Sequence, residues 1–385
     1  MQNDAAIIVA HVAQQSFSWE PVMHKVLFST VSVIALGFAS AAFASGSTSY
    51  DTQEGTGQTA TIDQTGGTND VVGTSGTPFD QNNGSGTGGN GISITQTGSY
   101  NSFGVSAASF QSGTTNAATI DQNGYNSGVV LQQTGTNNGS TAYNNWTNSG
   151  SGGIIVQDNT SDTSSIVLTQ NGSDSIFDIG QGGYNNLVNA TQIGTDQLYV
   201  RQGTSMAAYG GFGSSYETNS TVTVYQSGGG TGYSTNYASL AQGGGDSNQI
   251  SVTQIGFALG ADVNQNGSNN LFSSYQAGSG NMVGLPAAFV ADTPITQTGT
   301  GNQYYNVQLG TNSTANGSQL GTDNYVSNYQ SGNADAISGS QNGTNNQVYT
   351  WQTGGTDTLA YTQTGSNNFV SNSQSGSGNS VTIHQ

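Results

Sequence analysis

The chain has 385 residues, of which 58 are glycine and only 6% are charged. Its 20 acidic residues outnumber two cationic ones, Lys25 and Arg201, and the formal net charge is −18. A nucleic-acid-binding protein needs basic patches to neutralise phosphates, so this balance argues against that class. An ordinary enzyme domain has about 25% charged residues, so the composition also argues against an enzyme. Because there is no cysteine, disulfides and thiolate metal sites are excluded.

The N-terminal part has the features of a secretory signal peptide over residues 23–44. Lys25 supplies a short positive region, residues 26–39 are apolar, and small residues follow at Ala42 and Ala44. Such a segment is too short and wrongly flanked to span a membrane. We therefore expect secretion after cleavage and no membrane insertion of the remaining chain. Residues 1–22 are interpreted as an over-extended N-terminus, and residues 45–52 as a flexible leader.

The rest of the chain, residues 53–385, is an internal repeat built on the triplet Gln-x-Gly. From Gln297 to Gln385 every interval between these glutamines is 11 residues, and shorter runs with the same interval occur upstream. Fixed periodicity of this kind is typical of stacked repeat architectures. The regular glutamines are Gln297, Gln308, Gln319, Gln330, Gln341, Gln352, Gln363, Gln374 and Gln385.

Within each unit, numbered from Gln as position 0, the residues alternate as in a β-strand. Position +5 is often Asn or Asp, position +7 is usually apolar, and +11 is the next Gln, so these positions share one parity. Positions +1 to +4 carry the small and polar residues of a tight turn, with Gly at +2. The expected core residues at +7 are Val326, Ile337, Val348, Leu359, Val370 and Val381. The expected turn glycines are Gly299, Gly310, Gly321, Gly332, Gly343, Gly354, Gly365 and Gly376.

An 11-residue period also suits a right-handed helical coiled coil, but one Gly per unit would cost about 1 kcal/mol each in a helix. The pattern instead predicts an all-β fold. Two units of about seven strand and four turn residues form one 22-residue strand–turn–strand coil. Coils stack into a cross-β, amyloid-like β-solenoid with a thin core.

Stacking places like residues over like, so the Gln and Asn side chains are expected to form hydrogen-bonded ladders. The ladder asparagines at +5 are Asn302, Asn324, Asn346, Asn368 and Asn379. The spacing slips near residues 65–95, 134–169, 203–225 and 277–296, which are expected to be loops or degenerate coils.

The pattern resembles the curlin repeat of the major curli fibre subunits of bacteria. The unit from Gln341 through Gly343, Asn346 and Val348 to Gln352 shows it cleanly, as does the unit from Gln374 to Gln385. The resemblance implies a secreted subunit that polymerises into extracellular amyloid fibres for biofilm, adhesion and surface colonisation. It also implies two partners, a minor curlin nucleator and a curli-type outer-membrane secretion channel. This chain has many more repeats than the typical five of a curlin and has irregular inserts.

The repeat continues to Gln385, so an uncapped strand edge is expected there, which would template a second copy of the chain. Acidic residues are spread through the repeats. They either slow premature assembly as gatekeepers or are ordinary solvated charges, and both interpretations stay open. Examples are Asp63, Asp121, Asp178, Asp262 and Asp335.

No residue pattern indicates catalysis, a cofactor or a metal. His384 is the one histidine downstream of the expected cleavage site and is expected to face solvent, and one histidine cannot form a triad or a multi-histidine site. The segment from Gly243 to Asp246 matches a calcium-binding nonapeptide once, without neighbours in phase. Tyr349, Trp351 and Tyr361 either stack on sugars or dyes or simply decorate a strand face.

Two functions remain. The first is a structural homopolymer that forms a bacterial surface fibre. The second is a monomeric secreted β-solenoid binding module, an adhesin or an ice-binding protein. An ice-binding face needs Thr in register on consecutive coils. Positions +1 and +10 instead mix Thr with other residues. Position +1 is Asn342 in one unit and Thr353 in the next, and position +10 is Ser340 in one unit and Trp351 in the next. The polymer is therefore favoured.

Overall fold

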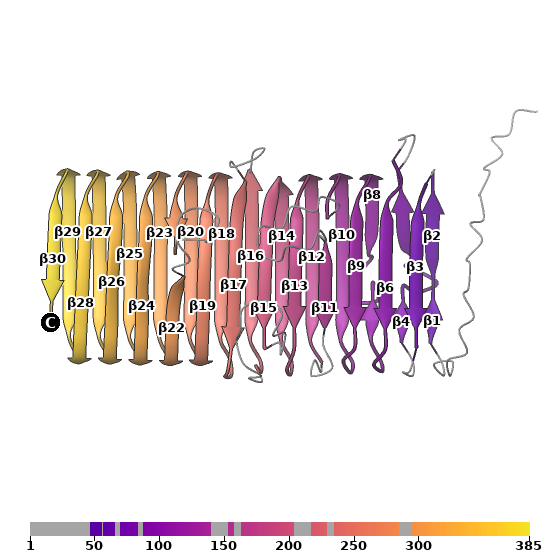
Figure 1. Ribbon diagram of the computed structural model, residues 1–385, viewed down its shortest axis with the longest axis horizontal. Coiled ribbons are helices and arrows are strands. Elements are labelled where there is room, and N and C mark those ends of the chain that lie inside the picture. The colour runs from indigo at the N-terminus through magenta and orange to yellow at the C-terminus, as the bar shows by residue number, and fades with distance from the viewer. Residues whose placement is uncertain are drawn as a thin grey trace, which may run out of the picture. The chain divides into compact units, whose positions relative to one another are not determined.

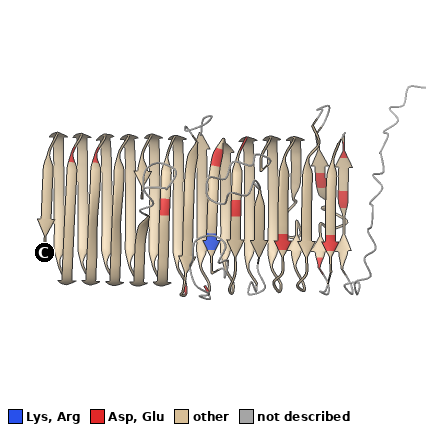
Figure 2. Cartoon of the chain, viewed as in Figure 1, with Lys and Arg blue, Asp and Glu red and all other residues tan. Residues whose placement is uncertain are grey.

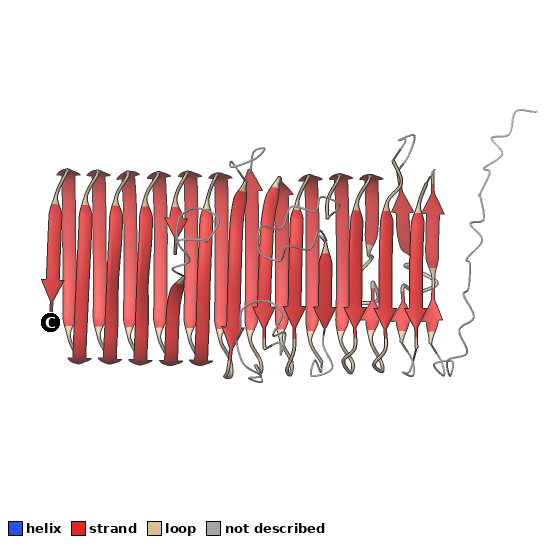
Figure 3. Ribbon diagram, viewed as in Figure 1, coloured by secondary structure: helices blue, strands red, loops and turns tan. Residues whose placement is uncertain are grey.

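The computed structural model describes residues 47–55, 57–65, 70–83, 88–139, 153–157, 163–203, 217–228, 235–284 and 294–385. All of them belong to one compact unit, Ala35–Gln385. The expected N-terminal extension 1–22 and signal peptide 23–44 lie outside the described residues, as do parts of the expected inserts. Within the described ranges there are strands and turns and no helix (Figure 3), so none is present that could cross a membrane.

The strands form two parallel sheets that alternate along the chain, so each coil contributes to both (Figure 1). The first sheet has 16 strands: β1 (Thr48–Ser49), β2 (Asp51–Glu54), β4 (Val71–Val72), β5 (Phe79–Asn82), β7 (Ser102–Phe103), β8 (Phe110–Thr114), β10 (Gly128–Thr136), β12 (Ser165–Ser173), β14 (Leu187–Gly194), β16 (Thr221–Gly228), β18 (Gln249–Phe257), β20 (Leu271–Ser279), β23 (Gln303–Thr311), β25 (Tyr325–Asn333), β27 (Gln347–Gly355) and β29 (Phe369–Ser377). The second sheet has 14 strands: β3 (Thr59–Gln64), β6 (Gly91–Gln96), β9 (Ala117–Gln122), β11 (Ile154–Gln157), β13 (Ile176–Gln181), β15 (Asp196–Gln202), β17 (Asn236–Gly243), β19 (Gly260–Ser268), β21 (Met282–Val283), β22 (Ile295–Thr300), β24 (Thr314–Thr322), β26 (Ala336–Thr344), β28 (Thr358–Ser366) and β30 (Ser380–His384).

The predicted fold class is confirmed: the chain is an all-β stack of strand–turn–strand coils. Both sheets run through thirteen successive strand positions, which at the usual strand spacing spans about 58 Å. In the C-terminal coils the register is the predicted 22 residues, since Gln347 pairs with Phe369 and Thr358 with Ser380.

The strands are longer than the expected seven residues. From β23 to β29 each spans nine residues, with two between one strand and the next. The turns also stack in register, so pairing continues through them: Gly354 lies opposite Gly376 and Gly355 opposite Ser377. The predicted four-residue turn is therefore a narrow bend inside a nearly continuous ladder.

Strand pairing also extends into segments without the repeat. The expected leader 45–52 contains β1 and the first half of β2, and these strands pair with β4 and β5. β4 and β5 lie in the insert expected at 65–95, β11 in that at 134–169, and β21 in that at 277–296. The insert at 203–225 contains the start of β16. β11 and β21 each lie between two longer strands, which present open backbone groups to them on both sides.

The core is a thin double row of inward side chains between the two sheets. Strand β27 shows the alternation, because Val348 and Gln352 are buried whereas Tyr349 and Trp351 are exposed. Five of the six expected core residues are almost fully buried: Val326, Ile337, Val348, Leu359 and Val370. Val381 is only partly buried, because β30 has a neighbouring strand on one side alone.

Two large tyrosines occupy the core where glycine leaves room. Tyr361 lies at an inward position and is only 2% exposed, so the expectation of an exposed ring there is wrong. Its register partner is Gly339, and a Cβ at that glycine would overlap the ring. Gly317, one coil further, lies beside Tyr304, which is also fully buried.

Gly339→Ala should therefore destabilise the stack by about 1–3 kcal/mol, because the close-packed core cannot accept the methyl group without moving Tyr361. The midpoint of denaturant unfolding, followed by circular dichroism of the purified chain, measures this. Gly76→Ala is the matched control, since a Cβ there meets nothing within 4 Å. The double variant G339A/Y361L should recover part of the loss, and equal midpoints for G339A and G76A would contradict the packing.

Candidate assembly interface

A continuous row of buried glutamines runs through the first sheet. Each side-chain Nε2 donates to the Oε1 of the glutamine one coil further, at 2.7–3.1 Å. We call this row the first Gln ladder. Its members are Gln53, Gln81, Gln111, Gln133, Gln170, Gln192, Gln226, Gln254, Gln276, Gln308, Gln330, Gln352 and Gln374.

The second sheet carries an equivalent second Gln ladder, again unbroken, with bonds of 2.8–3.1 Å. Its members are Gln64, Gln96, Gln122, Gln157, Gln181, Gln202, Gln242, Gln265, Gln297, Gln319, Gln341, Gln363 and Gln385. All nine glutamines expected from the regular C-terminal units thus lie in one of the two ladders.

Both ladders have one polarity, because every bond is donated toward the C-terminal end of the stack. The second N–H of most ladder amides fixes this orientation, because it donates to a backbone carbonyl. Gln341 Nε2, for example, also donates to the Tyr325 carbonyl at 3.0 Å and to that of Asn346 at 2.9 Å. An amide oxygen placed there would face carbonyl oxygens, so no amide can be reversed without losing these bonds.

Three ladder members escaped the sequence pattern because they lack Gln-x-Gly. They are Gln81, Gln157 and Gln202, all in or beside the expected inserts. Each ends a short run with alternating apolar residues, such as Ile155 two residues before Gln157. An inward-parity Gln at the end of such a run was the available signal.

The expected asparagines form shorter ladders at the bends. Asn324 Nδ2 donates to Asn302 Oδ1 at 3.0 Å, and Asn346 Nδ2 to Asn324 Oδ1 at 3.1 Å. The Asn368 backbone N–H then donates to Asn346 Oδ1 at 3.1 Å. Asn379 belongs to a different column on the other bend, where it donates to Asp357 Oδ1 at 2.9 Å.

The turn glycines lie where successive bends stack most closely. Gly343 has a φ of 137°, and a Cβ there would overlap the Gly365 carbonyl of the next coil. The same left-handed conformation occurs at Gly299, Gly310, Gly321, Gly354, Gly365 and Gly376. Gly332 lacks the positive φ but is equally crowded, by the Gly354 carbonyl and the Asp335 carboxylate.

Several carboxylates replace amides inside the bend columns. Asp335 and Asp357 are both fully buried, and Asp335 Oδ1 accepts from the Asp357 backbone N–H at 3.2 Å. Within the described residues, Asp335 Oδ2 and Asp357 Oδ2 have no hydrogen-bond partner. Burial raises the pKa of Asp335, with the neighbouring Asp357 charge adding to it. Asp178 and Asp262 are buried as well. The interpretation as solvated charges is therefore wrong for Asp178, Asp262 and Asp335.

Asp196 shows the strongest of these effects. It is fully buried in the same bend column, where its Oδ1 accepts from Asn236 Nδ2 at 3.0 Å. Its Oδ2 has no partner in the described structure. Desolvation raises the pKa of Asp196 from 3.8 to about 7, although hydrogen bonds from Asn236 oppose the shift. The folded stack therefore favours a protonated carboxyl at this position.

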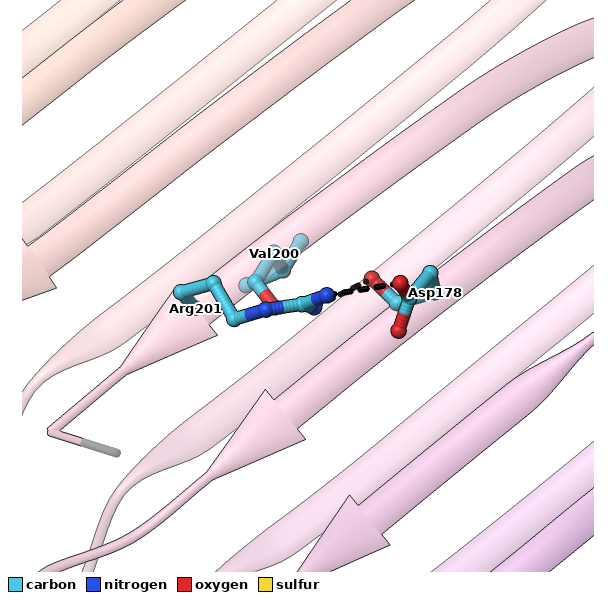
Figure 4. Close-up of polar contacts among 3 residues, drawn as sticks. All are labelled: Asp178, Val200 and Arg201. Carbon is cyan, nitrogen blue, oxygen red and sulfur yellow. Dashed lines mark hydrogen bonds and ion pairs between the residues drawn. The ribbon is translucent and has the colours of Figure 1, made fainter. Parts of the chain in front are cut away.

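The one cation among the described residues, Arg201, is engaged in an ion pair (Figure 4). Its guanidinium contacts the Asp178 carboxylate at 2.6 Å and donates to the backbone oxygens of Asp178 and Val200 at 3.0 and 2.9 Å. It therefore compensates a partly buried acid between neighbouring coils rather than forming a basic patch.

The other sequence candidates do not converge into a site. His384 is exposed on β30, as expected. Asp246 caps a turn, accepting from Thr218 Oγ1 at 2.9 Å and Asn219 Nδ2 at 2.8 Å. Across the part of the chain that is described, no group of three or more His, Cys, Asp or Glu residues could hold a metal ion.

The chain matches no known protein-family profile and no curated protein. The ladders and the two ends of the stack are therefore the features from which function is inferred.

Gln319→Leu should lower the free energy of unfolding by about 1–3 kcal/mol, because one N–H of Gln297 Nε2 loses its acceptor and Gln341 Oε1 loses its donor in a buried row. Denaturant midpoints measure the loss. Gln249→Leu is the control, since Gln249 lies on an exposed strand face outside the ladders. Equal midpoints for the two variants would show that the ladder does not hold the coils together.

The stack should be more stable in acid than at neutral pH. Between 3.8 and about 7 the folded chain keeps the Asp196 proton that the unfolded chain releases. Stability is therefore fully present at low pH and declines as the pH rises through this window. Asp196→Asn should remove this contribution and stabilise the chain at pH 8 by roughly 2–4 kcal/mol, with little change at pH 4. An equal effect at both pH values would contradict the assignment, and Asp63→Asn, on the exposed face of β3, serves as the control.

Proposed function

We propose that this chain is a secreted structural subunit that polymerises with copies of itself into extracellular, curli-like amyloid fibres on the bacterial surface. Such fibres would support a biofilm matrix, cell adhesion and colonisation. The proposal extends to the two partners that the curlin resemblance implies, a minor curlin nucleator and a curli-type outer-membrane channel.

The observation that carries the proposal is the constant polarity of the two Gln ladders. At the C-terminal end, Gln374 Nε2 and Gln385 Nε2 each donate one N–H to a backbone carbonyl and have a second N–H directed along the ladder. At the other end, Gln53 Oε1 and Gln64 Oε1 are the first acceptors of their rows, with no donor among the described residues. The donors of one copy thus suit the acceptors of the next, head to tail.

The backbone at the C-terminal end is equally open. Among the described strands, β29 pairs with β27 alone and β30 with β28 alone. The Gln347 N–H donates to the Asn368 carbonyl, so Asn368 faces β27 and the alternate residues of β29, such as Ser371, face outward. By the same reasoning, the bond from Thr358 to the Asn379 carbonyl makes Thr382 an outward residue of β30.

Charge does not oppose docking at this end. Strands β23 to β30 carry no Asp, Glu, Lys or Arg, and the acids of the described strands lie further toward the N-terminal end (Figure 2). An uncharged, flat strand edge with few gatekeeping residues is a template for further strands.

The first experiment is fibre diffraction of the purified chain after release from denaturant. We expect meridional reflections near about 4.7 Å and equatorial ones near about 10 Å, together with seeding that removes the lag phase. A chain that refolds to a stable monomer and never seeds would overturn the polymer and favour the binding module.

A second experiment blocks the C-terminal edge. Ser371→Pro with Thr382→Pro removes two outward N–H groups and should abolish elongation at this end, while the inward bonds to β27 and β28 remain. Single-fibre imaging of growth from preformed seeds reports it. The matched variant S371A/T382A keeps both N–H groups and should elongate normally; unimpaired growth of the proline variant would contradict head-to-tail addition.

A further inference from the structure

The two outer faces of the stack differ in chemistry. From β20 onward the first sheet presents aromatic rings outward, including Tyr305, Tyr325, Tyr349, Trp351 and Phe369. The corresponding outward positions of the second sheet hold small and hydroxyl residues, such as Ser318, Ser340 and Thr362. Successive 11-residue units alternate between the sheets, which is why the sequence showed only a mixture at position +10.

The rings of the first sheet form a continuous array across four consecutive strands. Ring centroids are 5.5 Å apart for Tyr305 and Tyr325, 5.2 Å for Tyr325 and Tyr349, and 5.8 Å for Tyr349 and Phe369. Beside them, Tyr329 and Trp351 stack at 4.0 Å with an interplanar angle of 17°. Tyr349 is 39% exposed and Phe369 56%, whereas Tyr305 and Tyr325 are half-buried, so a ligand can reach the array at Tyr349 and Phe369.

A shallow groove of about 180 Å³ lies on this array. Tyr325 lies between Gln303 and Gln347, its register partners on the neighbouring strands. Tyr349 forms a second wall, and the exposed carboxylate of Asp323 lies at the edge. The groove is therefore mainly polar, with amide donors and acceptors and one carboxylate acceptor beside the rings of Tyr325 and Tyr349.

We propose that this groove and ring array bind a neutral, β-linked polysaccharide. A pyranose ring has an apolar C–H face, which stacks on an aromatic ring, and an edge of hydroxyl groups, which amides and carboxylates recognise. The ring spacing is about the length of one sugar unit in an extended β-linked chain. A glycan chain lying along the stack can therefore contact successive rings while one sugar occupies the groove.

The local charge favours a neutral ligand over an ionic one. Strands β23 to β29 contain no charged residue, and Asp323 is the one carboxylate at the groove. A polyanion finds no cation here, and a polycation finds one acid alone, which surface screening weakens. The site does not require polymerisation, because all its residues belong to one copy of the chain.

The test measures binding of fluorescently labelled cellohexaose to the purified chain by anisotropy. The double variant Y325A/Y349A should weaken binding at least about tenfold, and Gln303→Ala with Gln347→Ala by a similar factor. Tyr325→Phe keeps the ring and should bind within about threefold of the parent chain. Tyr225→Ala removes an exposed ring of the same sheet, on β16, and should leave binding unchanged.

Seeded fibre growth, measured beside cellohexaose binding, distinguishes a glycan site from a contact between copies of the chain. Seeded growth should be unchanged in Y325A/Y349A, because neither ring belongs to a ladder; impaired growth with unchanged cellohexaose binding would instead make the array a contact between copies and overturn the glycan site. The site is also overturned if the parent chain fails to bind. Binding that disappears in about 0.5 M salt would show that the charge of the label, and not the neutral sugar, is recognised, and would also overturn the site.

Discussion

The pairing of buried side-chain amides is the constraint on which this structure depends. A buried glutamine without partners costs about 1–3 kcal/mol, and the chain buries one in each sheet at every coil. In-register stacking satisfies every amide between the two ends of each ladder, because each one meets the equivalent glutamine one coil away: Gln319 binds Gln341, which binds Gln363. A slip by one residue would turn every amide outward and bring polar surface residues into the core. The ladders therefore impose the parallel register as well as stabilising it.

The same constraint explains why the inserts are tolerated. Regular ladder neighbours are 22 residues apart, whereas Gln202 and Gln242 are separated by 40. Closing the longer loop costs only about 0.5 kcal/mol more in chain entropy. One preserved ladder bond contributes about 1 kcal/mol, which exceeds that difference. Extra residues can therefore leave the stack at a bend, provided that the chain returns with an inward Gln.

The sequence predicted the parts of the fold that repeat strictly. The 11-residue interval located Gln297 to Gln385, and strand parity located core residues such as Val348. It missed Gln157 and Gln202, because stacking needs only an inward amide and does not need the following Gly. The sequence pattern also could not show which outward side chains lie on the same sheet, since that depends on two units forming one coil. The burial of Asp335 was not predicted either. A bend column accepts carboxylate and amide side chains alike, and only the structure shows that this carboxylate is shielded from solvent.

The regular coils lie at the C-terminal end of the stack and the irregular coils precede them, which affects the order in which the coils fold. Strands β23 to β30 carry uniform spacing and no charged residue, whereas the coils before them hold the inserts and all the acids of the described strands, Asp196 among them. Uniform coils pair residues that are near in sequence, so they close with the smallest entropy loss and should order first. The irregular coils then add to a template that already fixes their register. A C-terminal nucleus also exposes its charge-free strand edge early. The buried carboxylates, which are Asp335 and Asp357 in the bends of the nucleus and Asp196 further along, must be protonated or desolvated before their coils close. Acids buried in the bends would then control the timing of assembly through the stability of the coil itself, rather than through repulsion on its surface.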